Sequence, residues 1–189
     1  YLLDYPYGCT EQTLNRFLPA AIVQKTLRDL GVPLAEVRKK RTNLNAQELG
    51  DPAVRARQWQ RFQREPVFDE GEVRAMVLAG LQRLAAMQIS DGGWGWFSGW
   101  GEHSYPHTTA VVVHGLQAAV ATGERLPGGM LESGLAWLDG WQEGEVGRLS
   151  RAALRIGDWK ERADELDALV FAALAEAGKT QGAMLEYLL

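Results

Sequence analysis

The sequence predicts an all-α fold, and three observations carry that prediction. Apolar residues recur at helical spacing in several long stretches, and glycine or proline stands at the ends of most of them. No stretch shows the alternation of apolar and polar residues that is typical of a half-buried strand. The 189 residues, 46% of them hydrophobic, are enough to build one domain with its own core.

The first expected helix covers residues 10–30. Its apolar residues fall at helical spacing: Leu14, Phe17, Leu18, Ala21, Ile22, Leu27 and Leu30. Pro19 lies in the middle of this stretch, and we expect it to kink the helix or to start a second one, because proline lacks the backbone N–H and crowds the preceding turn. Gly31 and Pro33 should then end it.

A second helix is expected from Asp69 through Met87. Asp69, with Glu72 three residues later, resembles a capping box. An apolar stripe follows at helical spacing: Val73, Val77, Leu81 and Leu84. A glycine- and tryptophan-rich loop, residues 91–97, comes directly after this helix.

A third helix should open at Ser104 and Pro106 and stop at Gly123. The residues expected on its apolar face are Ala110, Val113, Leu116 and Val120.

Two further helices are expected at residues 129–142 and 158–177. The first is built around Leu131, Leu135, Leu138 and Trp141, and the second around Leu166, Leu169, Val170, Ala173 and Leu174 before Gly178. The helices therefore pair, one hairpin spanning about 69–122 and the next about 129–178. This separation is of the order found in helical-hairpin repeats.

Composition and charge exclude several classes of protein. A net charge of −4 argues against nucleic acid as the main partner. A single cysteine excludes an intramolecular disulfide and a cysteine-based zinc site. No stretch approaches the 18 or so continuous apolar residues of a membrane span. The chain begins at Tyr1 without a methionine, so we expect it to be a piece of a longer protein.

Residues 35–66 differ from the rest in charge, with eight basic and four acidic residues. We interpret this basic segment as a solvated insertion with an amphipathic helix around Trp59 and Phe62. It could instead be a contact surface for another domain of the parent protein or, more remotely, a nucleic-acid contact.

The chemistry of the chain is expected at Cys9 and Gln12. Cys9 follows a Pro/Gly turn where the first helix begins, and a helix N-terminus favours a thiolate because its N–H groups and macrodipole stabilise negative charge. Gln12 lies three residues later, on the same helical face, so the sulfur and the carboxamide can meet. Attack of the sulfur on the carboxamide carbon, with loss of ammonia, would form an internal thioester. An amine, a hydroxyl or water could then open it. The plainer interpretation is a buried structural cysteine beside a polar glutamine.

The string from Pro6 to Gln12, Pro-Tyr-Gly-Cys-Thr-Glu-Gln, resembles the thioester signature of the α2-macroglobulin and complement family. Its continuation, residues 13–19, is similar to the bacterial α2-macroglobulins. Residues 85–116 look like a helix–loop–helix of the family's thioester-containing domain, through Gln88, the loop 91–97 and the run Thr-Ala-Val-Val at 109–112.

This resemblance implies a fold and a function. The fold would be an α/α toroid of helical hairpins, here an incomplete one spanning 1–189 with the insertion at about 35–66. The function would be that of a broad-spectrum protease inhibitor, a single-turnover covalent trap rather than an enzyme. A protease cuts a bait region in another domain, the thioester is exposed, and lysine amines of the protease open it.

By the same resemblance, Cys9 is the thiol and Gln12 the acyl donor. Gly8, Thr10 and Glu11 belong to the motif, and Tyr5 and Tyr7 are candidate shields against water. The implied partners are target proteases and other domains of the parent chain, with no cofactor. The implied location is the periplasm, the cell envelope or the cell exterior.

In complement-like members a histidine attacks the thioester first. The corresponding region, roughly residues 143–160, contains no histidine, so the resemblance implies direct reaction with amines. The histidines of this chain are His103, His107 and His114. The first two are four residues apart and could share a helical face, but a metal site would need a third ligand and the His-Glu-x-x-His pattern is absent.

A second resemblance concerns Gln88, Gly92 and Trp94, which match the Gln-x-x-x-Gly-x-Trp repeat of terpenoid cyclases, also α/α toroids. In those enzymes the Gln and Trp tie helix ends together, and we interpret the residues here as structural. The Asp-x-Asp-Asp cluster that those enzymes need is absent from these residues. The sequence is also compatible with a thiol hydrolase that uses Cys9 with a histidine base, and with a purely structural helical interaction module.

Overall fold

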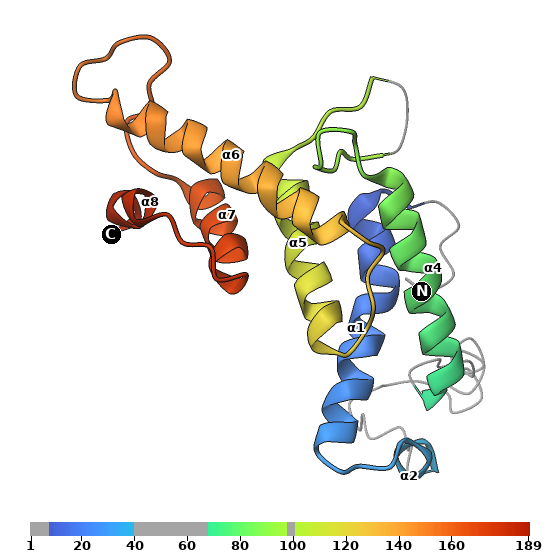
Figure 1. The fold of residues 1–189 in the computed structure, drawn as a ribbon. Helices are drawn as coiled ribbons and strands as arrows, with labels where there is room; N and C mark the ends of the chain where they lie inside the picture. Colours follow the sequence, from blue (N-terminus) through green and yellow to red (C-terminus); the bar gives the residue numbers. More distant parts are fainter. Residues whose placement is uncertain (1–7, 40–67, 98–100) are drawn as a thin grey trace, which may run out of the picture.

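The protein is built from α-helices. A computed structural model describes residues 8–39, 68–97 and 101–189, and within them lie seven helices: α1 (Thr10–Asp29), α2 (Leu34–Lys39), α4 (Glu70–Met87), α5 (Pro106–Ala121), α6 (Met130–Ser150), α7 (Glu165–Glu176) and α8 (Gly182–Leu188) (Figure 1). This part of the chain contains no strand, only an isolated bridge between Gln88 and Trp94. The all-α prediction is confirmed.

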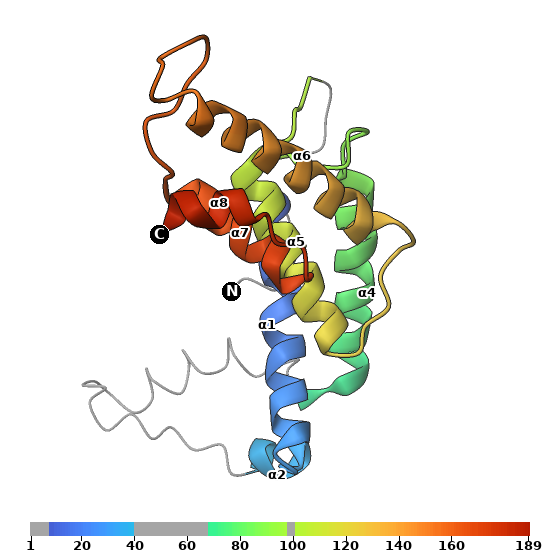
Figure 2. The same ribbon diagram turned by 60° about the vertical axis from the view of Figure 1, so that its left-hand side comes forward.

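Helix α1 packs against α4 on one side and α5 on the other (Figure 1). Helix α5 in turn packs against α6 and α7. The short α8 also packs against α6 and α7 (Figure 2). The predicted hairpin of α6 and α7 is a contacting pair, whereas α4 and α5 are joined through α1, which packs against both of them. The helix that follows Cys9 is therefore held from two sides.

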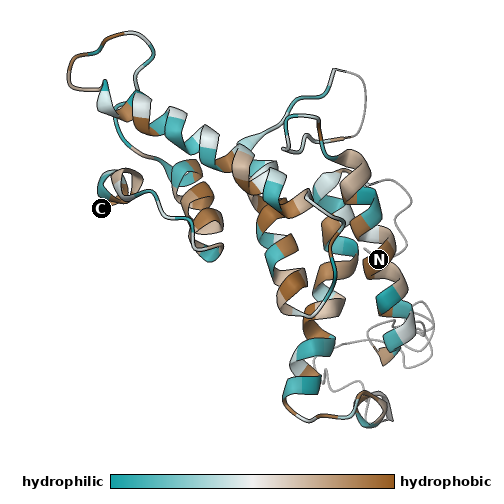
Figure 3. Cartoon of the chain, in the orientation of Figure 1, coloured by the Kyte–Doolittle hydropathy of each residue, from teal (hydrophilic) through white to brown (hydrophobic). Residues whose placement is uncertain are grey.

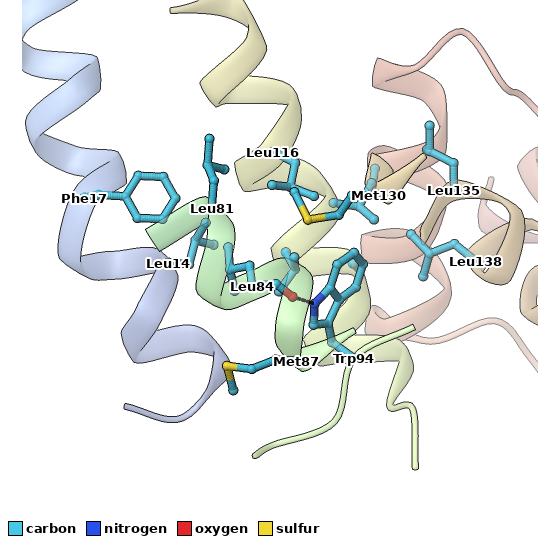
Figure 4. Packing of buried hydrophobic residues seen from close by; sticks show 14 of the residues in the cluster. Leu14, Phe17, Leu81, Leu84, Met87, Trp94, Leu116, Met130, Leu135 and Leu138 are labelled. Atoms are coloured by element: carbon cyan, nitrogen blue, oxygen red, sulfur yellow. Dashed lines mark hydrogen bonds between the residues drawn. The ribbon is translucent and has the colours of Figure 1, made fainter. Parts of the chain in front are cut away.

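One apolar core joins α1, α4, α5, α6 and α7 with the loop after α4 (Figure 4). Trp94 of that loop is fully buried, and Phe17 of α1 and Leu81 of α4 are each only 1% exposed. Figure 3 shows that both α1 and α6 carry a mixture of apolar and hydrophilic positions. Burial of this shared core is the main force that fixes α1 against its neighbours.

Two glycines let α1 approach its neighbours closely. A Cβ added to Gly80 of α4 would lie 2.1 Å from Cδ1 of Phe17, and one added to Gly115 of α5 would lie 2.6 Å from Cδ2 of Leu14. Both distances are shorter than carbon atoms tolerate. The position of α1 therefore depends on the absence of side chains at these two places.

The helix starts and stops follow their sequence signals in part. Asp69 caps α4 as predicted, with its Oδ1 accepting the Glu72 N–H at 2.9 Å. Gly31 and Gly123 follow α1 and α5 with positive φ, as predicted. The expected second helix at Pro19 is wrong, because α1 runs through this proline without interruption. Burial of Phe17 and Ala21 on either side offsets the local cost of the proline.

The predicted limits of α6 and α7 are wrong. Helix α6 continues past residue 142 to Ser150, and α7 begins at Glu165 rather than near 158. A polar cluster explains both differences: Lys160 Nζ lies 2.9 Å from Glu145 Oε2 of α6 and 2.6 Å from Asp167 Oδ2 of α7. The periodicity of apolar residues does not indicate where charged residues are buried as ion pairs, so it missed these helix limits.

The charges of this cluster stabilise one another. Burial of Lys160 favours its neutral amine, but hydrogen bonds to Asp164, Asp167 and Glu145 outweigh it and raise the pKa of Lys160. Asp164 also caps α7 in a reciprocal capping box with Asp167. The spacing of these two aspartates is the sequence signal that marks the true start of α7.

The remaining differences from expectation are smaller. Val120, expected on the apolar face of α5, is 47% exposed, and Ala119 takes the buried position instead. Helices α2 and α8 are not among the expected elements. The basic segment 35–66 begins within α2, and its remainder, with Trp59 and Phe62, lies outside the described residues. Among the described helices, none combines the length and the apolar character needed to cross a membrane.

Gly80→Ala should lower the free energy of unfolding by about 1–3 kcal/mol, because the new methyl group overpacks the contact with Phe17. The loss should occur although alanine is the better helix former. Gly144→Ala is the matched control: nothing lies within 4 Å of its added Cβ, so stability should rise by up to about 1 kcal/mol. Urea unfolding followed by circular dichroism measures both, and effects of the same sign would contradict the packing described.

Candidate functional site

Cys9 and Gln12 form a reciprocal cap at the start of α1. Cys9 is the N-cap residue, and its Sγ accepts the backbone N–H of Gln12 at 3.5 Å. In return, the Oε1 atom of the Gln12 side chain accepts the backbone N–H of Cys9 at 3.1 Å. This arrangement is a capping box in which a sulfur replaces the usual hydroxyl. The two side chains that the sequence singled out therefore fold over the same helical turn.

The start of α1 places a backbone donor beside each of the two side chains. If Sγ adds to the carboxamide carbon, negative charge develops on Oε1, the atom to which the Cys9 N–H already points. Cys9 is partly buried and Gln12 is exposed within the described residues.

Thr10 fastens this turn to a distant loop. Its hydroxyl donates to the carbonyl oxygen of Gly95 at 2.6 Å and lies 3.2 Å from that of Trp96. The Thr10 backbone N–H also donates to the Trp96 carbonyl, at 2.9 Å. Thr10 itself is only 1% exposed. Sequence reasoning missed this long-range contact, because no local pattern reports a pairing of residues so far apart in the chain.

Gln88 and Trp94 hold the loop in place. The Gln88 Nε2 group donates to the carbonyls of Gly92, at 2.8 Å, and Met130 of α6, at 2.9 Å. Trp94 donates from its ring Nε1 to the carbonyl of Leu84 at 2.9 Å (Figure 4). These bonds tie the end of α4 to the loop and to the start of α6.

Gly92 is required for its backbone conformation and its closeness to α6. Its φ of +98° lies in the region that side chains rarely adopt. A Cβ added there would lie 2.7 Å from the carbonyl oxygen of Ser133. Substitution would therefore displace the loop from α6.

Two acidic residues that the sequence analysis passed over brace the same loop. Glu102 accepts the backbone N–H groups of Trp96, at 3.1 Å, and Phe97, at 3.3 Å. Asp91 accepts from the Ser104 hydroxyl at 2.6 Å, while its other oxygen accepts from the ring N–H of Trp137 at 3.0 Å. A loop rich in glycine and flanked by acidic residues is a weak signal that could have indicated such a brace.

The hydrogen bonds of Asp91 shift its ionisation. Partial burial favours the protonated acid, but hydrogen bonds from Ser104, the Gly93 backbone and Trp137 outweigh it and hold the pKa of Asp91 below its usual value. The loop is thus fastened by a carboxylate rather than a carboxylic acid at neutral pH.

The histidines have other partners than the sulfur. His107 Nδ1 lies 3.5 Å from Glu11 Oε1, so Glu11 of the motif contacts the start of α5. His114 pairs with Glu176 at 2.7 Å, and the ring of His103 lies against that of Tyr105. The expectation that His103 and His107 share a helical face is wrong, because α5 begins only at Pro106. Within the described ranges, no three histidine, cysteine or acidic residues are grouped to hold a metal ion.

The remaining motif residues frame the turn. Gly8 is buried, its carbonyl lies 3.5 Å from Nη2 of Arg83, and an added Cβ would lie 3.1 Å from Thr13 Oγ1. The candidate shields Tyr5 and Tyr7 fall outside the described residues.

Comparison with known proteins places these features in context. No family model matches the chain. An alpha-2-macroglobulin of Thermotoga maritima is 28% identical over 137 residues, which cover 72% of this chain and 6% of that protein. An alpha-2-macroglobulin of Ralstonia nicotianae is 32% identical over 101 residues, covering 53% of this chain and 4% of that protein. The chain therefore matches only a small part of the length of these relatives.

Solved structures share the fold. Native alpha-2-macroglobulin from Escherichia coli, spanning domain MG7 to the C-terminus, matches 98% of this chain and 24% of that chain, with a TM-score of 0.56 and 24% identity. Salmonella alpha-2-macroglobulin reacted with methylamine matches 98% of this chain and 10% of that chain, with a TM-score of 0.57 and 21% identity.

Asp91→Asn should lower the free energy of unfolding by about 1 kcal/mol at about pH 7, because an amide is a weaker acceptor for Ser104 and Trp137. The folded-state pKa of Asp91 is lowered, so its contribution is complete above the unfolded pKa of about 4 and disappears as the pH falls through the folded value. The difference between wild type and variant should therefore shrink towards about pH 2–3.

Urea unfolding at several pH values measures this difference. Glu132→Gln, on the exposed face of the first turn of α6, is the control and should show little change at any pH. A constant difference between wild type and Asp91→Asn down to the lowest pH would contradict the role given to the carboxylate.

Proposed function

Because this chain is an alpha-2-macroglobulin-like protein domain, we propose that it is the thioester-containing domain of a protease-trapping inhibitor. The observation that carries the proposal is the reciprocal cap, which holds a cysteine sulfur and a glutamine carboxamide on one helical turn. A capping box ordinarily uses serine or threonine at the first position. A sulfur at that position offers weak hydrogen bonding but strong nucleophilicity.

The bond forms by acyl transfer within the turn. The sulfur of Cys9 attacks Cδ of Gln12, the Sγ–Cδ bond forms, and the Cδ–Nε2 bond breaks. The amide nitrogen takes up the thiol proton and leaves as ammonia. The Cys9 N–H supports the oxygen on which charge develops, as a donor in an oxyanion hole does.

The stored thioester is then opened by an amine of the captured protein. A lysine amine attacks Cδ, the C–S bond breaks, and the Cys9 thiol is regenerated while Gln12 becomes part of an isopeptide bond. The related Salmonella protein is described as reacted with methylamine, a small primary amine, which supports chemistry of this kind here. One molecule reacts once, so the chain acts as a covalent trap and not as a catalyst with turnover.

The other residues of the site take supporting roles in this proposal. Gly8, Thr10 and Glu11 shape the turn, and Tyr5 and Tyr7 shield it from water. A separate set forms the structural frame beneath it: Gln88, Gly92 and Trp94. The helices belong to an incomplete α/α toroid over residues 1–189, with the basic segment as an insertion.

The parent protein, in this proposal, supplies the bait region and the domains that cover the thioester. The relatives are many times longer than this chain, which is consistent with such further domains. Target proteases are the external partners, and the periplasm, cell envelope or cell exterior is the location where such proteases are met.

Peptide mass mapping of natively purified protein tests the proposal. The segment that holds Cys9 and Gln12 should be lighter by one ammonia and carry no titratable thiol. Methylamine should add to Gln12 and release one thiol per chain. Cys9→Ser and Gln12→Asn are the control variants, and neither should take up methylamine. An unreacted amide with a free thiol in the native protein would exclude the thioester, and repeated turnover of an ester substrate would favour a thiol hydrolase instead.

A further inference from the structure

We propose that Thr10 is a positioning residue for thioester formation, acting by clamping the reactive turn onto the carbonyls of Gly95 and Trp96. This inference rests on the proposed function and goes beyond it, since it assigns to one of the two residues between the reacting pair a role that the motif alone does not give.

The clamp consists of two attachments from one buried residue. The Thr10 hydroxyl donates to the Gly95 carbonyl at 2.6 Å, with the Trp96 carbonyl 3.2 Å away, and the Thr10 N–H donates to that second carbonyl at 2.9 Å. Thr10 is 1% exposed, so water does not compete for these bonds. Both the side chain and the backbone of the residue are therefore fixed.

The loop that carries the Gly95 and Trp96 carbonyls is itself held by other side chains. Glu102 accepts the N–H groups of Trp96 and Phe97, and a Cβ on Gly95 would lie 2.3 Å from Cγ of Glu102. The Trp94 N–H, next along the loop, donates to the Thr109 hydroxyl at 3.0 Å. The loop that accepts the Thr10 bonds is thus itself held in place by Glu102 and Thr109.

Fixing Thr10 matters because it lies inside the ring that the reaction closes. The new Sγ–Cδ bond joins residues 9 and 12, so the backbone torsions of Thr10 and Glu11 set how often the sulfur meets the carboxamide. Holding one of these two residues before reaction removes part of the ordering that the ring closure requires. The bond changes are those already given: Sγ–Cδ forms, Cδ–Nε2 breaks, and ammonia leaves with the thiol proton.

Glu11, the other residue inside the ring, has the weaker restraint. Among the described residues, its side chain pairs at 3.5 Å with His107, whose side chain is 59% exposed. An exposed pair of this kind contributes little and exchanges with water. The buried Thr10 contacts therefore carry most of the restraint on the turn.

Variants at Thr10 test the clamp by comparing threonine with valine and serine. Thr10→Val keeps the shape but removes the donor, and it should lower the fraction of native protein that holds the thioester by about ten-fold, the effect expected for one buried hydrogen bond. Thr10→Ser keeps the donor and should restore most of that fraction. Thr122→Val removes a hydroxyl that donates to the Ala119 carbonyl far from the turn, and it should leave the fraction unchanged.

The measurement is peptide mass mapping of the thioester fraction, made well below the melting temperature of each variant. Glu102→Ala, which removes the brace but leaves Thr10 intact, should give an intermediate loss and serves where Thr10→Val does not fold. A Thr10→Val or Glu102→Ala protein with the wild-type fraction would overturn the inference alone. Failure of Thr10→Ser to restore the fraction would also overturn it. A wild-type protein without any thioester would instead overturn the proposed function, and this inference with it.

Discussion

The hydrogen bond from the Thr10 hydroxyl to the Gly95 carbonyl joins two parts of the chain that are 85 residues apart, and the geometry of the candidate site depends on it. A helix N-terminus is ordinarily free to fray, because its first N–H groups lack partners within the helix. Here the first turn of α1 is docked on a loop and capped by Cys9 and Gln12 at once. The capping box sets the distance between the side chains of Cys9 and Gln12, and the docking holds the backbone that carries them.

The rest of the fold can be understood as support for that contact. Trp94 anchors the loop in the core, and Gln88 ties it to the start of α6. Gly80 and Gly115 allow α1, the helix that Thr10 opens, to lie close against α4 and α5. The polar cluster around Lys160 is remote from the turn and joins α6 to α7. The cluster contributes to the site only indirectly: it helps to position α6, and the first residue of α6, Met130, accepts a hydrogen bond from the Gln88 side chain.

The sequence alone predicted local features well and distant ones poorly. The all-α class, the Asp69 cap and the spacing that brings Cys9 near Gln12 follow from helical periodicity and capping preferences, which act over three or four residues. The continuity of α1 through Pro19 and the length of α6 depend on tertiary burial that a local pattern does not contain. The docking of Thr10 on Gly95 and the brace from Glu102 are of the same kind. Both join polar groups across the fold without any periodic signal.

The central claim is that Gln12 exists as a thioester of Cys9, and the chemical state of one carbon atom tests it most directly. Protein labelled with ¹³C and ¹⁵N on glutamine would report Cδ of Gln12 by NMR, with the Gln12→Asn variant used to assign the signal. If Gln12 is a thioester of Cys9, its Cδ should give a carbonyl resonance typical of a thioester, and this residue should show no side-chain NH₂ correlation. Addition of methylamine should move the carbon signal to the amide region. An ordinary NH₂ correlation from Gln12 in freshly prepared native protein would contradict the account.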